Sequence, residues 1–331
     1  MEERKVILKG TGIKQYFPIK GSMGKTTKVV KAVDGVDITI YEGEVYGLVG
    51  ETGCGKSTLG RTLIRLLNPT EGTVEIMGKD VTKFNDKELV PVRKDVQMVF
   101  QDPFTSLNPR IRVGDILMEV LDIHKIGKNK EERMEIAMNM LHKVGLRPEH
   151  FYRFPHEFSG GQRQRIGIAR ALILDPKLIV CDEPVSALDV SIQAQIVNLM
   201  QDLREEEGIS YLFIAHDISI VRYISDRIGV MYLGHLMEEA ETGELFSNPL
   251  HPYTQALLSA VPHANPHLSK ERIHLKGELP SPIDPPTGCV FHTRCPYATE
   301  LCARKVPRLK EISPGHKATC LLHMRGEDKT S

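Results

Sequence analysis

Long apolar segments are missing from this sequence, and so is any excess of one charge. No uncharged run among the 331 residues approaches the roughly 20 apolar residues of a membrane-crossing helix, so any membrane role would need a partner. Lys and Arg number 43, as do Asp and Glu, which gives no support for a bulk attraction to nucleic acid or anionic lipid. No apolar signal segment follows residues 1–5, so we expect a cytoplasmic protein.

Cysteine is scarce over most of the chain and concentrated near one end. The first 288 residues hold only Cys54 and Cys181. Eight prolines between residues 249 and 286 also break regular structure there. The overall composition is that of an ordinary globular protein. The rise in proline and cysteine content after residue 250 predicts two domains, residues 1–250 and 251–331. The second domain would contain the other four cysteines, at Cys289, Cys295, Cys302 and Cys320.

Strand and helix patterns alternate along the first domain, which predicts an α/β fold. Apolar runs predict strands at residues 44–49, 73–77, 96–100, 178–181, 211–215 and 230–233. Amphipathic patterns predict helices at residues 131–144, 166–173 and 190–206, the first with Met134 and Met138 on its apolar face. We interpret residues 102–173 as a helical insertion.

A phosphate-binding loop lies between the strand at residues 44–49 and an apolar helical stripe over residues 59–67, which Asn68 and Pro69 end. The loop fits the pattern in which glycines let backbone N–H groups surround phosphates. Lys56 would reach the β- and γ-phosphates, and the Ser57 hydroxyl would bind Mg²⁺. We therefore expect ATP contacts from Gly50, Glu51, Thr52, Gly53, Cys54, Gly55, Lys56, Ser57 and Thr58.

Two carboxylates end the apolar strand that begins at Leu178. A buried parallel strand presents functional groups at its carboxyl end. Asp182 would hold the water shell of Mg²⁺, and Glu183 would orient and polarise the attacking water. Taken alone, the pair could equally be an ordinary strand capped by acidic residues.

Four short strings complete an ordered set. Gln101 follows the strand at residues 96–100, Ser159-Gly-Gly-Gln162 precedes a helix, Ala187-Leu-Asp189 follows the carboxylates, and His216 ends the strand at residues 211–215. Together with the phosphate loop and the carboxylate pair, this set resembles the ATPase subunit of an ABC transporter over residues 10–245.

The resemblance implies a head-to-tail dimer that closes over two ATP molecules. Gln101 would touch Mg²⁺ and the attacking water, and would report the nucleotide state to membrane subunits. His216 would contact the γ-phosphate and help to hold Glu183 and the water. Asp189 would lie at the dimer interface. The γ-phosphate held by the partner would be contacted by Ser159, Gly160, Gly161 and Gln162.

Two predictions concern the surroundings of the nucleotide. An upstream aromatic ring should stack on adenine, and we choose Tyr16, with Phe17 as the alternative. Cys54 lies near a helix N-terminus and Lys56, both of which could lower its thiol pKa. We expect thiol reagents to block ATP binding through Cys54, without any catalytic role for the thiol.

The region after residue 250 contains His251-Pro-Tyr-Thr-Gln-Ala-Leu-Leu258, Gly277-Glu-Leu-Pro-Ser-Pro282 and Pro285-Pro-Thr-Gly-Cys289. These strings resemble the C-terminal extension of dipeptide and oligopeptide permease ATP-binding subunits, and nickel importers share parts of them. The resemblance implies a translocase that hydrolyses ATP to import peptides, located peripherally on the cytoplasmic face of the cell membrane. The expected partners are a related ATPase subunit in a heterodimer, two transmembrane permease subunits and, indirectly, an extracytoplasmic peptide-binding protein; nucleic acid is not among them.

The four C-terminal cysteines allow three interpretations. Disulfides are disfavoured in a cytoplasmic ATPase. Structural zinc sites usually contain closely spaced cysteine pairs, which are absent here. Iron–sulfur clusters accept four thiolates at irregular spacings, and members of the peptide-importer subfamily carry a [4Fe-4S] cluster in this region. We favour that cluster, with Zn²⁺ as the alternative, and treat His292, His316 and His323 as solvated loop residues.

Two other classes of function are alternatives. A soluble ABC ATPase acting on DNA or the ribosome would carry two cassettes, or a cassette interrupted by long coiled coils or zinc modules, and this chain shows neither pattern. A redox sensor that uses the cysteine region and signals through ATPase activity is a further alternative. Co-purification with membrane proteins would separate the importer from both.

Overall fold

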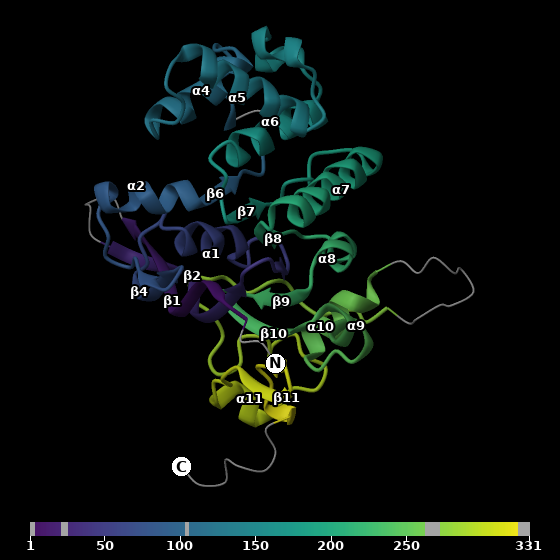
Figure 1. Cartoon of the computed structure of the whole chain (residues 1–331). Coiled ribbons are helices and arrows are strands. Elements are labelled where there is room, and N and C mark those ends of the chain that lie inside the picture. The colour runs from purple at the N-terminus through teal and green to yellow at the C-terminus, as the bar shows by residue number, and fades with distance from the viewer. Residues whose placement is uncertain (1–3, 21–25, 103–105, 262–271, 324–331) are drawn as a thin grey trace. The chain divides into compact units, whose positions relative to one another are not determined.

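The computed structural model describes residues 4–20, 26–102, 106–261 and 272–323, and the chain forms two compact units (Figure 1). The first unit comprises residues 1–7, 40–44 and 76–214. The second comprises residues 8–39, 45–75 and 215–331. Because the chain passes between the units several times, each is assembled from segments that are distant in the sequence.

Three parallel strands form the sheet of the first unit. β7 (Leu178–Asp182) pairs with β6 (Val96–Val99) on one side and with β8 (Ser210–Ile214) on the other. All residues of β7 and β8 are buried, as expected for parallel strands covered on both faces. The other elements of this unit are β5 (Lys79–Asp80), α2 (Asp86–Asp95), α4 (Val113–Ile123), α5 (Lys130–Lys143), α6 (Gly160–Leu172), α7 (Val190–Glu207) and the 3₁₀ turns Pro148–Tyr152 and Pro155–Glu157.

Helices α4, α5 and α6 pack against one another in the part of the first unit that connects β6 to β7 (Figure 1). Leu121 of α4 and both Ala137 and Leu141 of α5 are fully buried. Met134 and Met138 are only half-buried, so they border this core rather than fill it. The predicted helix at residues 131–144 is therefore confirmed as α5, with its small and branched residues at the centre of the packing.

A mixed sheet forms the centre of the second unit. β3 (Val45–Val49) runs parallel to β9 (Arg227–Tyr232), and β10 (His235–Glu241) runs antiparallel to β9. Next to β10, the sheet continues with β12 (His316–Ala318) and then β11 (Lys310–Ser313), both antiparallel. The C-terminal region therefore contributes two strands to the same sheet that carries the phosphate loop at the end of β3.

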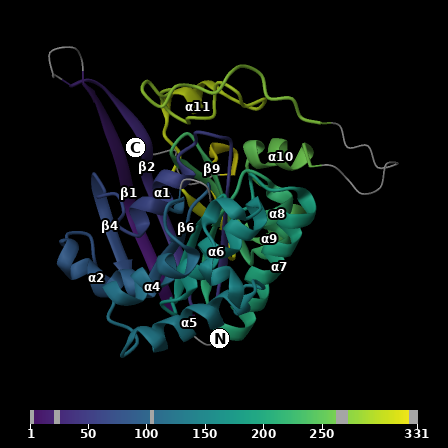
Figure 2. The ribbon, with the colours of Figure 1, turned by 90° about the horizontal axis from the view of Figure 1, so that it is seen from above.

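A long hairpin forms a second sheet, in which β1 (Val6–Lys20) lies between β2 (Thr26–Tyr41) and β4 (Glu71–Ile76); β1 and β2 are the long purple strands in Figure 2. The helices of the second unit are α1 (Lys56–Leu63), α8 (Ile218–Ile224), α9 (Thr242–Ser247), α10 (Pro252–Ser259), α11 (Glu300–Arg304) and the 3₁₀ turn Leu321–His323. The sequence predicted that α1 would continue to Leu67. It ends at Leu63 instead, because Arg65 adopts left-handed backbone geometry with φ of 59°.

A buried polar network joins the C-terminal region to β10. The side chains of Glu238 and His316 are both fully buried, and Nε2 of His316 lies 2.7 Å from Oε1 of Glu238. The backbone N–H groups of Leu250 and His251 donate to the same carboxylate at 2.7 and 2.9 Å. The expectation that His316 is a solvated loop residue was wrong, because it is the first residue of β12 and its side chain is buried against Glu238 of β10.

Candidate nucleotide site

The phosphate loop connects β3 to α1 in the second unit, as the sequence predicted. Gly53 and Gly55 have φ of 81° and 103°, values that favour glycine. A Cβ atom at Gly55 would lie 2.1 Å from the carbonyl oxygen of Ala32, so only glycine fits there. Gly55 is also the N-cap of α1 and supplies no capping side chain. The first N–H groups of this helix are thus oriented for an anion.

Lys56 lies beneath this loop. Only 4% of the residue is exposed, and its Nζ donates to the carbonyl oxygens of Gly50 at 2.8 Å and Glu51 at 3.1 Å. The ammonium group of Lys56 is therefore held at the start of the loop, next to the carbonyl groups of Gly50 and Glu51. An ammonium group has three N–H donors, and its contact with phosphates remains a prediction.

Glu51 of the phosphate loop has two partners that the sequence did not predict. Its backbone N–H donates to the hydroxyl oxygen of Tyr253 at 2.9 Å. Both carboxylate oxygens accept from Nη1 of Arg294, at 3.0 and 2.9 Å. These partners follow Glu51 by 202 and 243 residues, so no local pattern in the sequence could have indicated them.

The two predicted carboxylates lie in the first unit at the end of β7. Asp182 is fully buried, and Glu183 adopts φ of 47°, a rare left-handed geometry for a glutamate. Nε2 of Gln101 donates to Oε2 of Glu183 at 2.8 Å. Gln101, which the sequence assigned to Mg²⁺ and the attacking water, therefore lies beside Glu183, which it assigned to the same water. Backbone strain at such a residue is typical of a functional position.

The predicted signature segment caps a helix of the first unit. Ser159 is the N-cap of α6, its N–H donates to Oε1 of Gln162 at 3.1 Å, and its Oγ accepts from the N–H of Gln162 at 3.4 Å. A Cβ atom at Gly161 would lie 2.5 Å from Cγ2 of Ile192 on α7, so glycine lets the two helices approach. This capping places the start of α6 earlier than the predicted residue 166.

Asp189 ends the loop before α7, and His216 lies in the short loop that follows β8. Asp189 is the N-cap of α7 in the first unit, and the next residue, Val190, is 81% exposed. His216 is an exposed residue of the second unit and follows Ala215, whose N–H donates to the carbonyl oxygen of Leu48 at 3.1 Å. The strand before His216 ends at Ile214, one residue earlier than the sequence predicted, and the roles of both residues remain predictions.

The four C-terminal cysteines gather in the second unit. Burial and the proximity of the other three thiols raise the pKa of Cys289 to about 11, and its N–H donates to the carbonyl oxygen of Cys302 at 2.7 Å. Cys320 is buried, whereas Cys295 and Cys302 are partly exposed. Among the described residues, no group of three or more His, Cys, Asp or Glu side chains is arranged around a point that a single metal ion could occupy.

Comparison with known proteins identifies the family. The family model described as ABC transporter matches residues 33–186. The family model described as oligopeptide/dipeptide transporter, C-terminal region, matches residues 237–302. The putative oligopeptide transport ATP-binding protein YkfD of Bacillus subtilis is 56% identical over 304 residues, which cover 91% of this chain and 92% of that protein. The oligopeptide transport ATP-binding protein OppF of Escherichia coli is 54% identical over 97% of both chains. The chain belongs to the ABC transporter ATP-binding proteins.

Solved structures confirm the ABC ATPase fold. The ATP-binding cassette MJ0796, a dimer in a post-hydrolysis state with ADP and phosphate, matches with a TM-score of 0.64 and 29% identity, covering 71% of this chain and 99% of that one. CbiO1 from Clostridium perfringens, part of the transporter complex cbiONQ, gives 0.62 and 28%, covering 74% and 92%. None of the helices described in this ABC ATPase is long and apolar enough to cross a membrane.

One expectation about the phosphate loop of this ABC ATPase was wrong. Cys54 is 1% exposed, and burial raises the pKa of its thiol more than the nearby Lys56 lowers it. The sequence showed the charged neighbour but not the burial of the thiol beneath the loop. Cys54 therefore packs beneath the loop as a buried thiol, and burial disfavours its thiolate.

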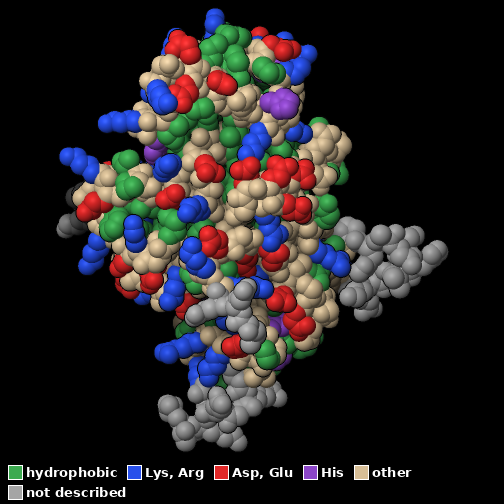
Figure 3. Space-filling model, viewed as in Figure 1, with side chains coloured by type: hydrophobic (Ala, Val, Ile, Leu, Met, Phe, Trp, Pro, Cys, Tyr) green, Lys and Arg blue, Asp and Glu red, His purple; other side chains and the backbone are tan. Residues whose placement is uncertain are grey.

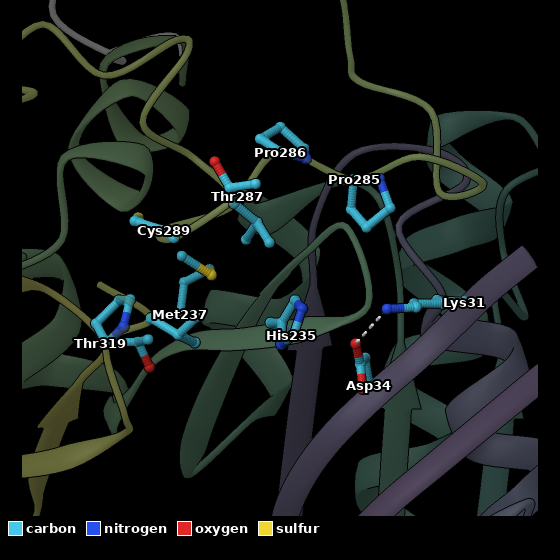
Figure 4. Close-up of a pocket in the computed structure, with 13 residues that line it drawn as sticks. Lys31, Asp34, His235, Met237, Pro285, Pro286, Thr287, Cys289 and Thr319 are labelled. Atoms are coloured by element: carbon cyan, nitrogen blue, oxygen red, sulfur yellow. Dashed lines mark ion pairs between the residues drawn. The ribbon is translucent and has the colours of Figure 1, made fainter. Parts of the chain in front are cut away.

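A cavity of about 300 Å³ in the second unit of the ABC ATPase was also unexpected (Figure 4). His235 and Met237 of β10 line it, together with residues 285–290 of the C-terminal region. Nζ of Lys31 lies 3.9 Å from Oδ2 of Asp34 at its edge, and Oδ1 of Asp34 accepts from the hydroxyl group of Tyr16 at 2.6 Å. Tyr16 is half-buried, and its stacking on adenine remains a prediction.

Proposed function

We propose that this chain is the ATP-hydrolysing subunit of an ABC importer that takes up dipeptides or oligopeptides across the cytoplasmic membrane. The observation that carries the proposal is the extent of the likeness, because a relative named for oligopeptide transport matches over 97% of both chains. The match to the oligopeptide/dipeptide transporter C-terminal region supports it further. An importer of nickel or another small solute is the alternative, since such importers share parts of the C-terminal pattern.

ATP hydrolysis needs a phosphate cradle, a metal ion and an oriented water. In our proposal the backbone N–H groups of residues 50–58 and Lys56 bind the phosphates. Glu183 accepts a proton from the attacking water and orients it, and Gln101, which already bonds to that carboxylate, keeps it in place. His216 contacts the γ-phosphate, and the ring of Tyr16 stacks on adenine.

The proposed magnesium site uses three oxygen donors of the kind that this ion prefers. They are the Ser57 hydroxyl, the Asp182 carboxylate, acting through bound waters, and the Gln101 amide oxygen. Magnesium would neutralise charge that develops on the transferred phosphoryl group. The hydrogen bond from Gln101 to Glu183 uses the amide nitrogen, which leaves the amide oxygen as the group for the ion.

We propose that the working ATPase is a dimer with a related chain. Ser159, Gly160, Gly161 and Gln162 would contact the γ-phosphate held by the partner, and Asp189 would lie between the subunits. The 81% exposure of Val190, next to Asp189, supports an interface at this place. The dimeric cassette MJ0796 with ADP and phosphate supports it as well.

The membrane-facing part of the proposal rests on the helical insertion, residues 102–173. Ile123 and Tyr152 are 64% and 50% exposed there, and such apolar groups favour contact with another protein. We propose that this insertion contacts two transmembrane permease subunits, and that the ATPase therefore lies peripherally on the cytoplasmic face of the membrane. An extracytoplasmic peptide-binding protein would act indirectly. Residues 1–250 would form the ATPase domain and residues 251–331 its extension.

We propose a [4Fe-4S] cluster at Cys289, Cys295, Cys302 and Cys320. The mutual proximity of the four thiols supports it. Zn²⁺ is the alternative occupant of the same four thiolates. Assay of iron, zinc and acid-labile sulfide in anaerobically purified protein tests the assignment; one zinc without sulfide would contradict it.

The catalytic assignment is tested with Glu183→Gln, which preserves the size of the side chain and its bond to Gln101. We expect hydrolysis to fall by about a hundredfold or more, with little change in the dissociation constant for ATP. Glu206→Gln, an exposed position on α7, is the matched control and should hydrolyse ATP at the parental rate. Rapid hydrolysis by Glu183→Gln would remove Glu183 from its assigned role.

The substrate class is tested in cells that lack this chain. Uptake of a labelled dipeptide and a labelled tripeptide should be lost and should return when the chain is supplied, but not when its Glu183→Gln variant is supplied. Restored uptake of nickel alone would select the small-solute alternative. A chain that co-purifies with ribosomes or DNA rather than membrane proteins would support the soluble class. The face of the molecule seen in Figure 3 carries positive and negative side chains side by side, which does not favour binding to nucleic acid.

A further inference from the structure

The C-terminal region contacts the phosphate loop at one residue, Glu51. Arg294 bonds to both carboxylate oxygens, and Tyr253 accepts from the backbone N–H. The third contact of Glu51 is made by its carbonyl oxygen, which accepts from Nζ of Lys56. The side chain, N–H and carbonyl of a single loop residue are therefore fixed separately, and two of the three partners come from beyond residue 250.

Arg294 is itself held firmly. Its side chain is 10% exposed, against 27% for Glu51. Its backbone N–H donates to the carbonyl oxygen of Phe291 at 3.0 Å, and its guanidinium carbon lies 5.9 Å from the centroid of the Tyr232 ring. Arginine is a permanent cation in proteins, so this guanidinium group brings a positive charge to the loop.

Aromatic rings support both contacts. Phe291 packs against Tyr232 at 5.2 Å and against Tyr253 at 5.4 Å between ring centroids, and the two tyrosine rings lie 4.8 Å apart. Phe291 stands two residues after Cys289, and Arg294 stands one residue before Cys295. We call residues 289–295 the cysteine segment. This segment contains Arg294 and so positions its guanidinium group directly. Through the ring of Phe291 it also supports the ring of Tyr253, which carries the hydroxyl group.

The ion pair between Arg294 and Glu51 changes the net charge that the phosphate loop presents to a nucleotide. Glu51 places a negative charge in a loop whose ligand is a polyphosphate, and an unpaired carboxylate there would repel the nucleotide. Arg294 neutralises this charge and holds the carboxylate to one side. We propose that Arg294 is a positioning residue for the phosphate loop, through which the cysteine segment sets the affinity for ATP.

The test compares ATP binding by the full chain and three variants, using a fluorescent ATP analogue. Arg294→Met keeps an unbranched apolar stem but removes the guanidinium group and leaves Glu51 without its ion-pair partner, and should weaken binding about tenfold. Arg294→Lys should recover part of this loss, since a point charge can still reach the carboxylate. Glu51→Gln combined with Arg294→Met should bind almost as tightly as the parent, because the unpaired charge is gone.

Arg304→Ala is the matched control, since Arg304 pairs with Glu300 in the same region but its side chain is 78% exposed. It should bind ATP like the parent. The loss in Arg294→Met should appear in KM and not in kcat, and should shrink at high salt. Unchanged affinity in Arg294→Met would overturn the proposal. So would a double variant no better than Arg294→Met, which would indicate a general structural defect instead.

Discussion

Removal of the Glu238 carboxylate should release the C-terminal region from the sheet. This side chain is fully buried and accepts from the N–H groups of Leu250 and His251 and pairs with Nε2 of His316. In Glu238→Leu these three groups lose their partner, and each buried unsatisfied group costs about 1–3 kcal/mol. Because leucine recovers some apolar burial, we expect unfolding to become easier by about 4 kcal/mol.

Hydrogen exchange is the assay that locates this effect. The amides of β11 and β12 should exchange far faster in Glu238→Leu, while those of β7 in the first unit should change little. Circular dichroism in guanidinium chloride gives the overall loss of stability, which suits a chain without tryptophan. Glu244→Gln is the control, because the Glu244 side chain is 43% exposed although it also meets His316. A loss below about 1 kcal/mol in Glu238→Leu would refute the proposed role of this network.

Three further predictions follow from burial and close packing. Cys54 should react with iodoacetamide at least about tenfold more slowly in the folded chain than in urea, because burial raises its pKa; equal rates by mass spectrometry would contradict this. Gly161→Ala should destabilise the chain by about 1–2 kcal/mol through contact with Ile192, whereas Gly167→Ala in the same helix, where a Cβ meets no atom within 4 Å, should be neutral or stabilising in thermal unfolding. Burial lowers the pKa of His251 from 6.5 to about 3, so its contribution to stability is complete above pH 6.5 and lost as pH falls toward 3; His251→Asn should flatten that dependence, and an unchanged slope would refute it.

Local sequence patterns predicted the elements of the nucleotide site well. The strand before Gly50, the strand that ends at Asp182 and the capped helix after Ser159 each depend on residues within a few positions of one another. Such short-range preferences are readable without the fold. The bond between Gln101 and Glu183 could be anticipated too, because both follow neighbouring parallel strands.

Burial and long-range partners could not be predicted in the same way. The sequence around Cys54 shows Lys56 but not the packing that removes the thiol from water. His316 looks like a loop residue until β12 pairs with β10. Arg294 and Tyr253 give no signal of their contact with Glu51, since that contact exists only when the sheet of the second unit is complete.

The bond between Arg294 and Glu51 also has a consequence for synthesis of the chain. Its two residues are 243 positions apart, and a ribosome adds about 5–20 residues per second, so the loop waits for tens of seconds before its last partner exists. During that time Glu51 has no Arg294 to pair with. If Arg294 positions the phosphate loop as we propose, full affinity for ATP would develop only after residue 294 has been added and has reached the loop.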